Sequence, residues 1–238
     1  MEKVADWFLS VIENFYQTVL YDGRYLLILN GLKNTLIMAL GAVVLGLIIG
    51  GIISIIRYTN KTKNKFKILN NICRIYVTII RGTPALLQLM IMYYIIFKTS
   101  SISSVIVGIL AFGINSGAYC SEILRSGFES IDDGQLEAGV SLGLSYTQTL
   151  TYIIIPQAVK NSLPSIGNEF ITLIKETAIA GYIGIVDLTR ASDIIASRTY
   201  DYFFPLITIA AIYLFITAVL SALLRSLERK LDISDTSR

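Results

Sequence analysis

The chain contains no histidine and only two cysteines, Cys73 and Cys120, among its 238 residues. Catalysis and metal binding through histidine are therefore excluded, and two cysteines are too few for a zinc cage or a disulfide framework. Charged residues are also scarce, at 16%, against about 25% in an average soluble domain. Hydrophobic residues make up 54%, and the mean hydropathy is +0.64. This composition predicts a protein embedded in a membrane and excludes intrinsic disorder.

Five apolar stretches approach the length of about 20 residues that an α-helix needs to cross a bilayer. They comprise residues 35–56, 75–97, 105–124, 164–185 and 202–224. The second is interrupted by Arg81-Gly82-Thr83-Pro84, and the fourth carries charged residues. The first contains Gly46 and Gly50, whose spacing favours close helix packing, either inside one subunit or at a dimer seam. The sequence thus predicts an all-α membrane protein with five transmembrane helices.

The positions of the basic residues predict the orientation. Between the first two spans lie Arg57, Lys61, Lys63, Lys65, Lys67 and Arg74, and after the fifth come Arg225, Arg229 and Lys230. Only Lys98 lies between spans two and three. By the positive-inside rule the first loop and the C-terminus are cytoplasmic and the N-terminus is outside. Segment 125–160 then lies inside and segment 187–201 outside.

The predicted organisation has three parts: an N-terminal segment 1–25, a transmembrane domain 26–225 and a cytoplasmic tail 226–238. In the first part Val4, Phe8, Val11 and Phe15 repeat at helical spacing. This pattern predicts an amphipathic helix in the outer membrane interface, and a flexible tail is the alternative. The interrupting Asp6 and the lack of a basic start argue against a signal peptide.

The inner loop carries a spaced pattern. Glu137-Ala138-Gly139 is followed by Gly143 and then by Ile153-x-Ile155-Pro156. The pattern predicts two short helices joined by a glycine-containing turn, with Glu137 near the start of the first, where the helix dipole favours a carboxylate. Pro156 is expected to end the second helix.

This spacing resembles the EAA loop of ABC-importer permeases, with Gly139 in place of the third alanine and Ile155 in place of leucine. Other segments resemble the permeases for polar amino acids (histidine, glutamine, arginine and cystine): Arg81-Gly82-Thr83-Pro84, the run Gly117–Gly127, Pro156-Gln157-Ala158, Asn168-Glu169-Phe170-Ile171 and Leu173–Thr177. Glu176 stands where aspartate is usual, and Ala178 where serine is frequent. The resemblance covers roughly residues 26–225.

The resemblance implies a type I ABC importer permease fold and a set of partners. A coupling helix over roughly 137–146 would dock on a dimer of ATPase subunits, and the docking candidates are Glu137, Ala138, Gly143 and Leu144. A capping carboxylate and a turn glycine are the alternative roles of Glu137 and Gly143. The resemblance also implies a second permease copy or paralogue, an extracytoplasmic binding protein and a location in a bacterial cytoplasmic membrane.

The sequence contains no phosphate-binding loop, so we expect no ATPase activity in this chain and no cofactor or metal of its own. ATP and Mg²⁺ would be bound by the partner ATPase. We also expect contact with membrane lipid and none with nucleic acid.

Depth within the spans selects candidates for the substrate pathway, because polar side chains near the bilayer midplane are costly and usually face a cavity. The candidates are Gln88, Asn115, Ser116, Asn168, Glu169, Thr172 and Lys175. A zwitterionic amino acid needs a cation such as Lys175 for its carboxylate and an acceptor such as Glu169 or Asn115 for its ammonium group. Alternatively, Lys175 and Glu176 neutralise each other and Asn115 bridges helices.

The predicted function is the membrane-spanning subunit of an ATP-driven importer for a polar amino acid, working by alternating access. A one-component channel or ion-coupled transporter that uses Glu169, Lys175 and Glu176 is the alternative. Glu122 and Arg125, three residues apart, are interpreted as a structural pair. The transported amino acid and the choice between homodimer and heterodimer stay open.

Overall fold

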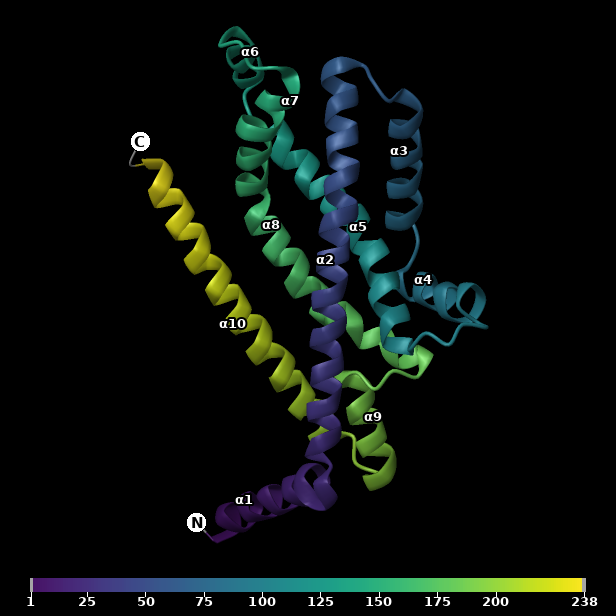
Figure 1. Cartoon of the computed structure of the whole chain (residues 1–238). Coiled ribbons are helices and arrows are strands. Elements are labelled where there is room, and N and C mark those ends of the chain that lie inside the picture. Colours follow the sequence, from purple (N-terminus) through teal and green to yellow (C-terminus); the bar gives the residue numbers. More distant parts are fainter. Residues whose placement is uncertain (1, 237–238) are drawn as a thin grey trace.

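A computed structural model describes the backbone of residues 2–236 and the side chains of residues 4, 6–7 and 9–230, and its described regular structure is helical (Figure 1). The α-helices are α1 Glu2–Phe15, α2 Tyr25–Lys63, α3 Lys67–Arg81, α4 Ala85–Ile91, α5 Ser104–Glu129, α6 Gly134–Ser141, α7 Tyr146–Thr149, α8 Ile155–Glu176, α9 Leu188–Thr199 and α10 Phe203–Thr236. Shorter π and 3-10 segments join some of them: Tyr16–Leu20, Tyr21–Gly23, Met92–Ile96, Leu150–Ile154 and Thr177–Ile183.

The centre of the bundle is the packing of α5 between α2 and α8. Helix α2 has 39 residues, so it is about 58 Å long at 1.5 Å per residue. Met38 of α2, Phe112 of α5 and Leu173 of α8 are almost completely buried where these helices meet. A Cβ atom on Gly46 would lie 2.7 Å from Ser116 Oγ, and one on Gly50 would lie 2.6 Å from Cys120 Cβ. The small-residue motif therefore serves close packing within one subunit, one of the two roles predicted for it.

Three helices within the described residues are long and apolar enough to cross a membrane: Tyr25–Lys63, Ser104–Glu129 and Phe203–Lys230. The pair Lys67–Arg81 and Ala85–Ile96 together passes the same test but is bent by 105°. The bend falls at the interruption noted in the predicted second span. Pro84 adopts an extended backbone (φ −63°, ψ 134°), and proline disfavours the helical conformation of the residue before it.

The predicted fourth span, 164–185, is not one continuous α-helix in the structure. Helix α8 begins earlier, at Ile155, and ends at Glu176, after which the chain continues as the 3-10 segment Thr177–Ile183. Its Lys160, Glu169, Lys175 and Glu176 also make this helix less apolar than the other spans. The described helices thus supply three apolar spans, or four with the bent pair.

The inner loop forms a helical hairpin, as predicted, although its boundaries differ. Helix α6 ends at Ser141, and Gly143 has φ +87°, the left-handed conformation that glycine adopts most readily. The coupling helix predicted over 137–146 is therefore interrupted by this turn. The prediction that Pro156 ends the second helix is wrong, because Pro156 lies in the first turn of α8 and follows α7 and a π segment without a break. Proline has no N–H to donate to the helical ladder, and the π segment directly before it is a place where a helix accommodates such an interruption.

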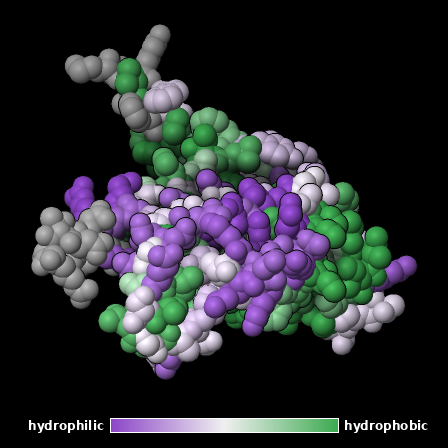
Figure 2. All heavy atoms as spheres, turned by 90° about the horizontal axis from the view of Figure 1, so that it is seen from above, coloured by the Kyte–Doolittle hydropathy of each residue, from purple (hydrophilic) through white to green (hydrophobic). Residues whose placement is uncertain are grey.

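The molecule has two distinct ends. The α6 end, where α6, α7 and the C-terminus of α2 lie, is opposite the α9 end, where α1 and α9 lie (Figure 1). Figure 2 looks onto the α6 end and shows hydrophilic side chains gathered over it. Four basic residues around the α2–α3 junction belong to this end: Lys61 and Lys63 in the last turn of α2, Lys65 in the connection and Lys67 at the start of α3.

The chain termini show where the predicted boundaries need adjustment. The predicted amphipathic segment contains α1, which lies across the foot of α2 (Figure 1) with Val4, Leu9 and Ile12 at least 60% exposed. Helix α10 continues past the predicted boundary at residue 226 to Thr236. Residue 1 and residues 237–238 of the predicted end segments lie outside the described residues.

Candidate functional site

Two partly buried polar pairs join three helices of the bundle. Ser116 Oγ on α5 donates a hydrogen bond to Glu169 Oε1 on α8, at 2.8 Å. Asn115 Nδ2 donates to Gln88 Oε1 on α4, at 2.9 Å. Ser116 is fully buried and Asn115 is 4% exposed. The structure therefore brings four of the seven predicted pathway residues into two adjacent contacts, and Asn115 bridges helices as one alternative predicted.

Gln88 also fixes the break between α3 and α4. Its Nε2 donates to Ile80 O at 2.8 Å and to Thr83 Oγ1 at 2.7 Å. Pro84 interrupts the helical hydrogen-bond ladder at this corner. The Gln88 side chain therefore replaces part of the missing backbone hydrogen bonding. The corner is thereby tied to Asn115, a position of the predicted pathway.

The remaining pathway candidates lie on a different face of α8. Asn168 and Lys175 are exposed in the single chain, and Thr172 is half-buried. Their spacing of four and three residues places them on one side of the helix, whereas Glu169 turns toward α5. Lys175 and Glu176 interact electrostatically, although no ion pair joins them among the described residues, so their mutual neutralisation stays a prediction. Helix α8 thus presents one polar stripe outward and one carboxylate inward.

A cavity of about 710 Å³ opens between α5, α8 and α10, and polar side chains including Ser126, Ser130, Asn161 and Glu228 line it. Asn161 Nδ2 donates to Ser130 Oγ at 2.8 Å. Glu122 also lines it.

The hairpin of α6 and α7 exposes three of its four predicted docking residues. Glu137 lies in the first turn of α6, as predicted, and Glu137, Ala138 and Gly143 are exposed, while Leu144 is half-buried. Two further apolar side chains are exposed beside them, Val140 at 51% and Leu142 at 82%. Neither residue was among the predicted docking residues. Leu142 directly precedes the turn residue Gly143, and an apolar residue in that position could have indicated it.

Tyr146 anchors this hairpin to the C-terminal end of α2. Its hydroxyl lies 2.7 Å from Thr62 Oγ1, and Lys63 Nζ lies 4.7 Å from the centre of its ring. One layer deeper, Tyr58 of α2 stacks on Phe128 of α5 with ring centres 4.8 Å apart. The hairpin is therefore held directly against the C-terminal end of α2. None of these anchoring residues was predicted.

Gly139 is the point of closest contact within the hairpin. A Cβ atom there would lie 2.4 Å from Cγ2 and 2.7 Å from Oγ1 of the fully buried Thr149. We expect Gly139→Ala to destabilise the hairpin by about 1–3 kcal/mol, because the added methyl group overpacks this contact. The apparent unfolding midpoint of the purified protein should fall by at least about 2 °C.

The matched control is Ala138→Ser, at the exposed neighbouring position, which should leave the midpoint unchanged. Adding Thr149→Ala to Gly139→Ala removes both colliding atoms, and it should recover part of the midpoint despite the loss of the hydrogen bond from Thr149 Oγ1 to Ser145 O. An unaltered midpoint for Gly139→Ala, or no rescue by the second change, would contradict this account of the contact.

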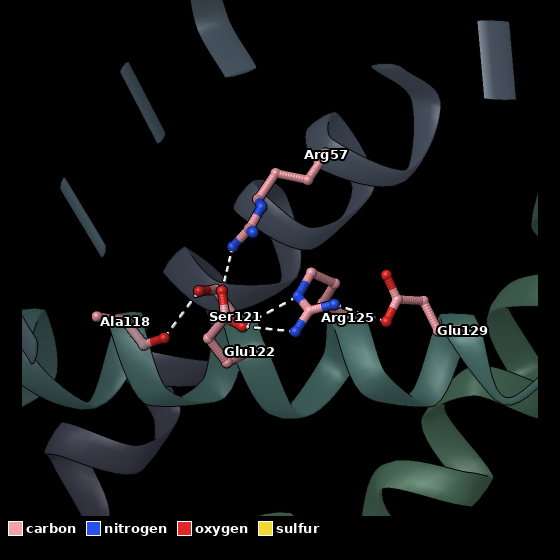
Figure 3. A network of polar contacts seen from close by, with 6 residues as sticks. All are labelled: Arg57, Ala118, Ser121, Glu122, Arg125 and Glu129. Atoms are coloured by element: carbon pink, nitrogen blue, oxygen red, sulfur yellow. Dashed lines mark hydrogen bonds and ion pairs between the residues drawn. The ribbon is translucent and has the colours of Figure 1, made fainter. Parts of the chain in front are cut away.

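The predicted pair of Glu122 and Arg125 is confirmed and belongs to a larger network (Figure 3). Arg125 Nη2 lies 2.8 Å from Glu122 Oε2, and Arg125 Nη1 lies 2.6 Å from Glu129 Oε2. Arg57 of α2 forms an ion pair with Glu122 from the other side. Cys73 and Cys120 are free and buried.

Asp187, at the start of the predicted outer segment 187–201, is a buried capping residue. Its carboxylate accepts hydrogen bonds from Thr189 N at 2.9 Å and Arg190 N at 3.3 Å, and so caps α9. The residue is fully buried, and burial raises the pKa of its carboxyl group to about 6. Arg190 and Asp193, by contrast, form an exposed pair.

Residues 42–233 match the family model described as the binding-protein-dependent transport system inner membrane component. The chain belongs to this family. It is 37% identical to a putative glutamine transport system permease protein of Rickettsia typhi, over 95% of this chain and all of that protein. It is 38% identical to the arginine transport system permease protein ArtQ of Bacillus subtilis, over 87% of this chain and 94% of the relative.

A solved structure supports the same assignment. The crystal structure of an amino acid ABC transporter with histidines contains a chain that is 40% identical, with a TM-score of 0.79, covering 94% of this chain and 98% of that one. The chain is therefore the inner-membrane permease component of an ABC amino acid importer with the type I permease fold, as the sequence resemblance indicated. Permease components of this kind are not themselves catalytic.

Proposed function

We propose that this chain forms half of the translocation pathway for a polar amino acid and that a separate ATPase dimer drives it. The observation that carries the proposal is the α6–α7 hairpin. It exposes an acidic residue and two large apolar side chains at one end of the molecule, and the described part of the chain does not cover them. Exposed apolar side chains grouped with polar ones favour a protein partner.

The contacts of the hairpin support a coupling role. Its anchor on α2 through Tyr146 and Thr62 connects any movement of a bound ATPase to the longest helix of the bundle. Helix α2 in turn packs along α5, which carries Asn115 and Ser116. ATP binding, with Mg²⁺, in the partner would thus change the exposure of the polar centre, which is alternating access around one site.

Recognition of the substrate uses the polar groups of α5 and α8. Glu169 and Asn115 supply acceptors for an α-ammonium group, and the exposed Lys175 supplies a cation for the carboxylate. Asn168 and Thr172, on the same face of α8 as Lys175, face a second permease copy or paralogue across the pathway. The names of the relatives, which refer to glutamine and arginine transport, agree with this substrate class.

The orientation follows from charge. The basic α6 end is proposed to be cytoplasmic, with the ATPase, by the positive-inside rule. The α9 end then faces outward, with the N-terminus, and receives the substrate-binding protein. The membrane is the cytoplasmic membrane of a bacterium.

Coexpression with candidate ATPase subunits tests the proposal. Gly143→Asp and Glu137→Lys should each release the ATPase during purification in nanodiscs, because both place the wrong charge or bulk on the docking surface. Gly143→Asn is the matched control for the backbone, since asparagine tolerates the left-handed conformation of φ +87° better than most residues and adds no charge. It should retain the ATPase better than Gly143→Asp.

Failure would take a specific form. If no ATPase copurifies, and the reconstituted chain alone moves an amino acid down an ion gradient, the one-component alternative is correct. Glu169 and Glu176 would then be ion-coupling residues. Equal release by Gly143→Asn and Gly143→Asp would instead assign Gly143 to the turn alone.

A further inference from the structure

Three hollows meet at Arg74, on the side of the bundle formed by α2, α3 and α5. One, of about 310 Å³, is lined by Arg57, Arg74 and Arg81 together with Glu122. Another, of about 290 Å³, extends from Arg57 and Arg74 to Lys61 and Arg125. The third, of about 430 Å³, runs along α3 itself and is lined by Asn71, Arg74, Ile75, Thr78 and Ile79. A single elongated ligand can therefore contact all three.

The charges around the first two hollows are not balanced. Five basic residues line them, against the two carboxylates of Glu122 and Glu129. Both carboxylates are already engaged, Glu122 by Arg57 and Arg125, and Glu129 by Arg125 (Figure 3). Arg74 makes no hydrogen bond or ion pair with any described residue, and it is exposed. The electrostatic complement of this region is an anion.

The third hollow adds an apolar requirement. Ile68, Ile72, Ile75 and Ile79 form a stripe along α3 and are 56–80% exposed. Arg74 and Arg81, seven residues apart, share the neighbouring face of the helix. The hollow beside Arg74 connects the two faces, because it contains Arg74 at one end and Ile79 at the other. A soluble anion such as phosphate would leave this apolar part empty.

The position along the helices matches the membrane boundary. The first predicted span ends at Ile56, directly before Arg57, and the second begins at Ile75, directly after Arg74. Both arginines therefore lie where lipid headgroups meet the acyl chains.

We propose that this region is a binding site for an anionic phospholipid. The lipid phosphate lies between Arg57 and Arg74, and one acyl chain follows Ile75 and Ile79 along α3. The excess of positive charge favours a headgroup with net negative charge over a zwitterionic one.

The test uses the full-length chain purified in detergent and mixed with phosphatidylglycerol or phosphatidylcholine, with lipid retention counted by native mass spectrometry. Phosphatidylglycerol should be retained preferentially. Arg74→Gln should weaken its retention about fivefold, as one basic residue near an anionic lipid surface contributes about that factor. Arg225→Gln is the matched control, because it removes the same charge from an exposed position of α10 that lines none of the three hollows. Its retention should stay clearly above that of Arg74→Gln, because Arg225 lies outside the proposed site.

A second arm separates a lipid from a small anion. Ile75→Ser with Ile79→Ser should also weaken phosphatidylglycerol retention, and millimolar inorganic phosphate should not displace the lipid. Displacement by phosphate together with unchanged retention in the isoleucine variant would show a small-anion site instead.

Two results would overturn the proposal directly. One is equal retention of the two lipids; the other is the same retention by Arg74→Gln and Arg225→Gln. Disulfide crosslinking of Ile75→Cys between two copies in the membrane would assign this face of α3 to a protein interface rather than to lipid.

Discussion

Gly50→Leu is expected to prevent the chain from accumulating as folded protein in the membrane, whereas Gly51→Leu should leave it folded. A Cβ atom at position 50 would lie 2.6 Å from Cys120 Cβ and 2.7 Å from the backbone nitrogen of Ser121. At position 51 the described residues leave open space within 4 Å of a Cβ atom. A leucine at position 50 must therefore push α5 away from α2, and overpacking of this kind costs about 1–3 kcal/mol or more.

The measurement is the yield of monodisperse protein after detergent extraction, followed by the apparent unfolding midpoint. The two variants make the same substitution in consecutive residues of one helix, so hydrophobicity and helix propensity are matched. Equal loss in both would show that leucine is harmful in this helix for another reason. Equal tolerance would show that α2 and α5 do not pack as closely as the glycine distances require.

The sequence predicted the features that depend on local pattern. The apolar runs marked α2, α5 and α10, and the spacing around Glu137 and Gly143 marked the hairpin. Depth within the spans marked Glu169 and Asn115 as polar residues of the bundle, but not their partners. Each of these is a property of residues within a few turns of one helix, or of composition along it.

Features that depend on distant partners were missed. The contact between Tyr146 and Thr62 joins residues 84 positions apart, and no periodicity in either segment indicates it. The interruption at Arg81-Gly82-Thr83-Pro84 was visible, but the 105° bend depends on how Gln88 bonds to Ile80 and Thr83 once the corner forms. The early start of α8 was also missed, because Pro156 was interpreted as a helix end, whereas a π segment directly precedes it and the helical structure continues through it.

Glu169→Gln is expected to reduce ATP-driven amino acid uptake in proteoliposomes by about tenfold or more, with the ATPase still bound. Glutamine has nearly the same shape as glutamate, and its side-chain oxygen can still accept the hydrogen bond from Ser116 Oγ, which is 2.8 Å long in the native chain. The packing of α5 against α8 should therefore survive. The substitution removes the negative charge that is proposed to bind the α-ammonium group of the substrate. A hydrogen bond to a charged group contributes about 1.5–3 kcal/mol, which corresponds to roughly tenfold or more in substrate affinity.

Ser116→Ala provides the opposite change, since it removes the donor and keeps the carboxylate. If Glu169 acts on the substrate, Ser116→Ala should reduce uptake less than Glu169→Gln does. If Glu169 only holds the two helices together, the order reverses: Glu169→Gln transports normally and Ser116→Ala loses stability. Both variants should be measured for uptake and for the unfolding midpoint. The charge of Glu169 affects uptake, whereas the contact between Ser116 and Glu169 affects the midpoint.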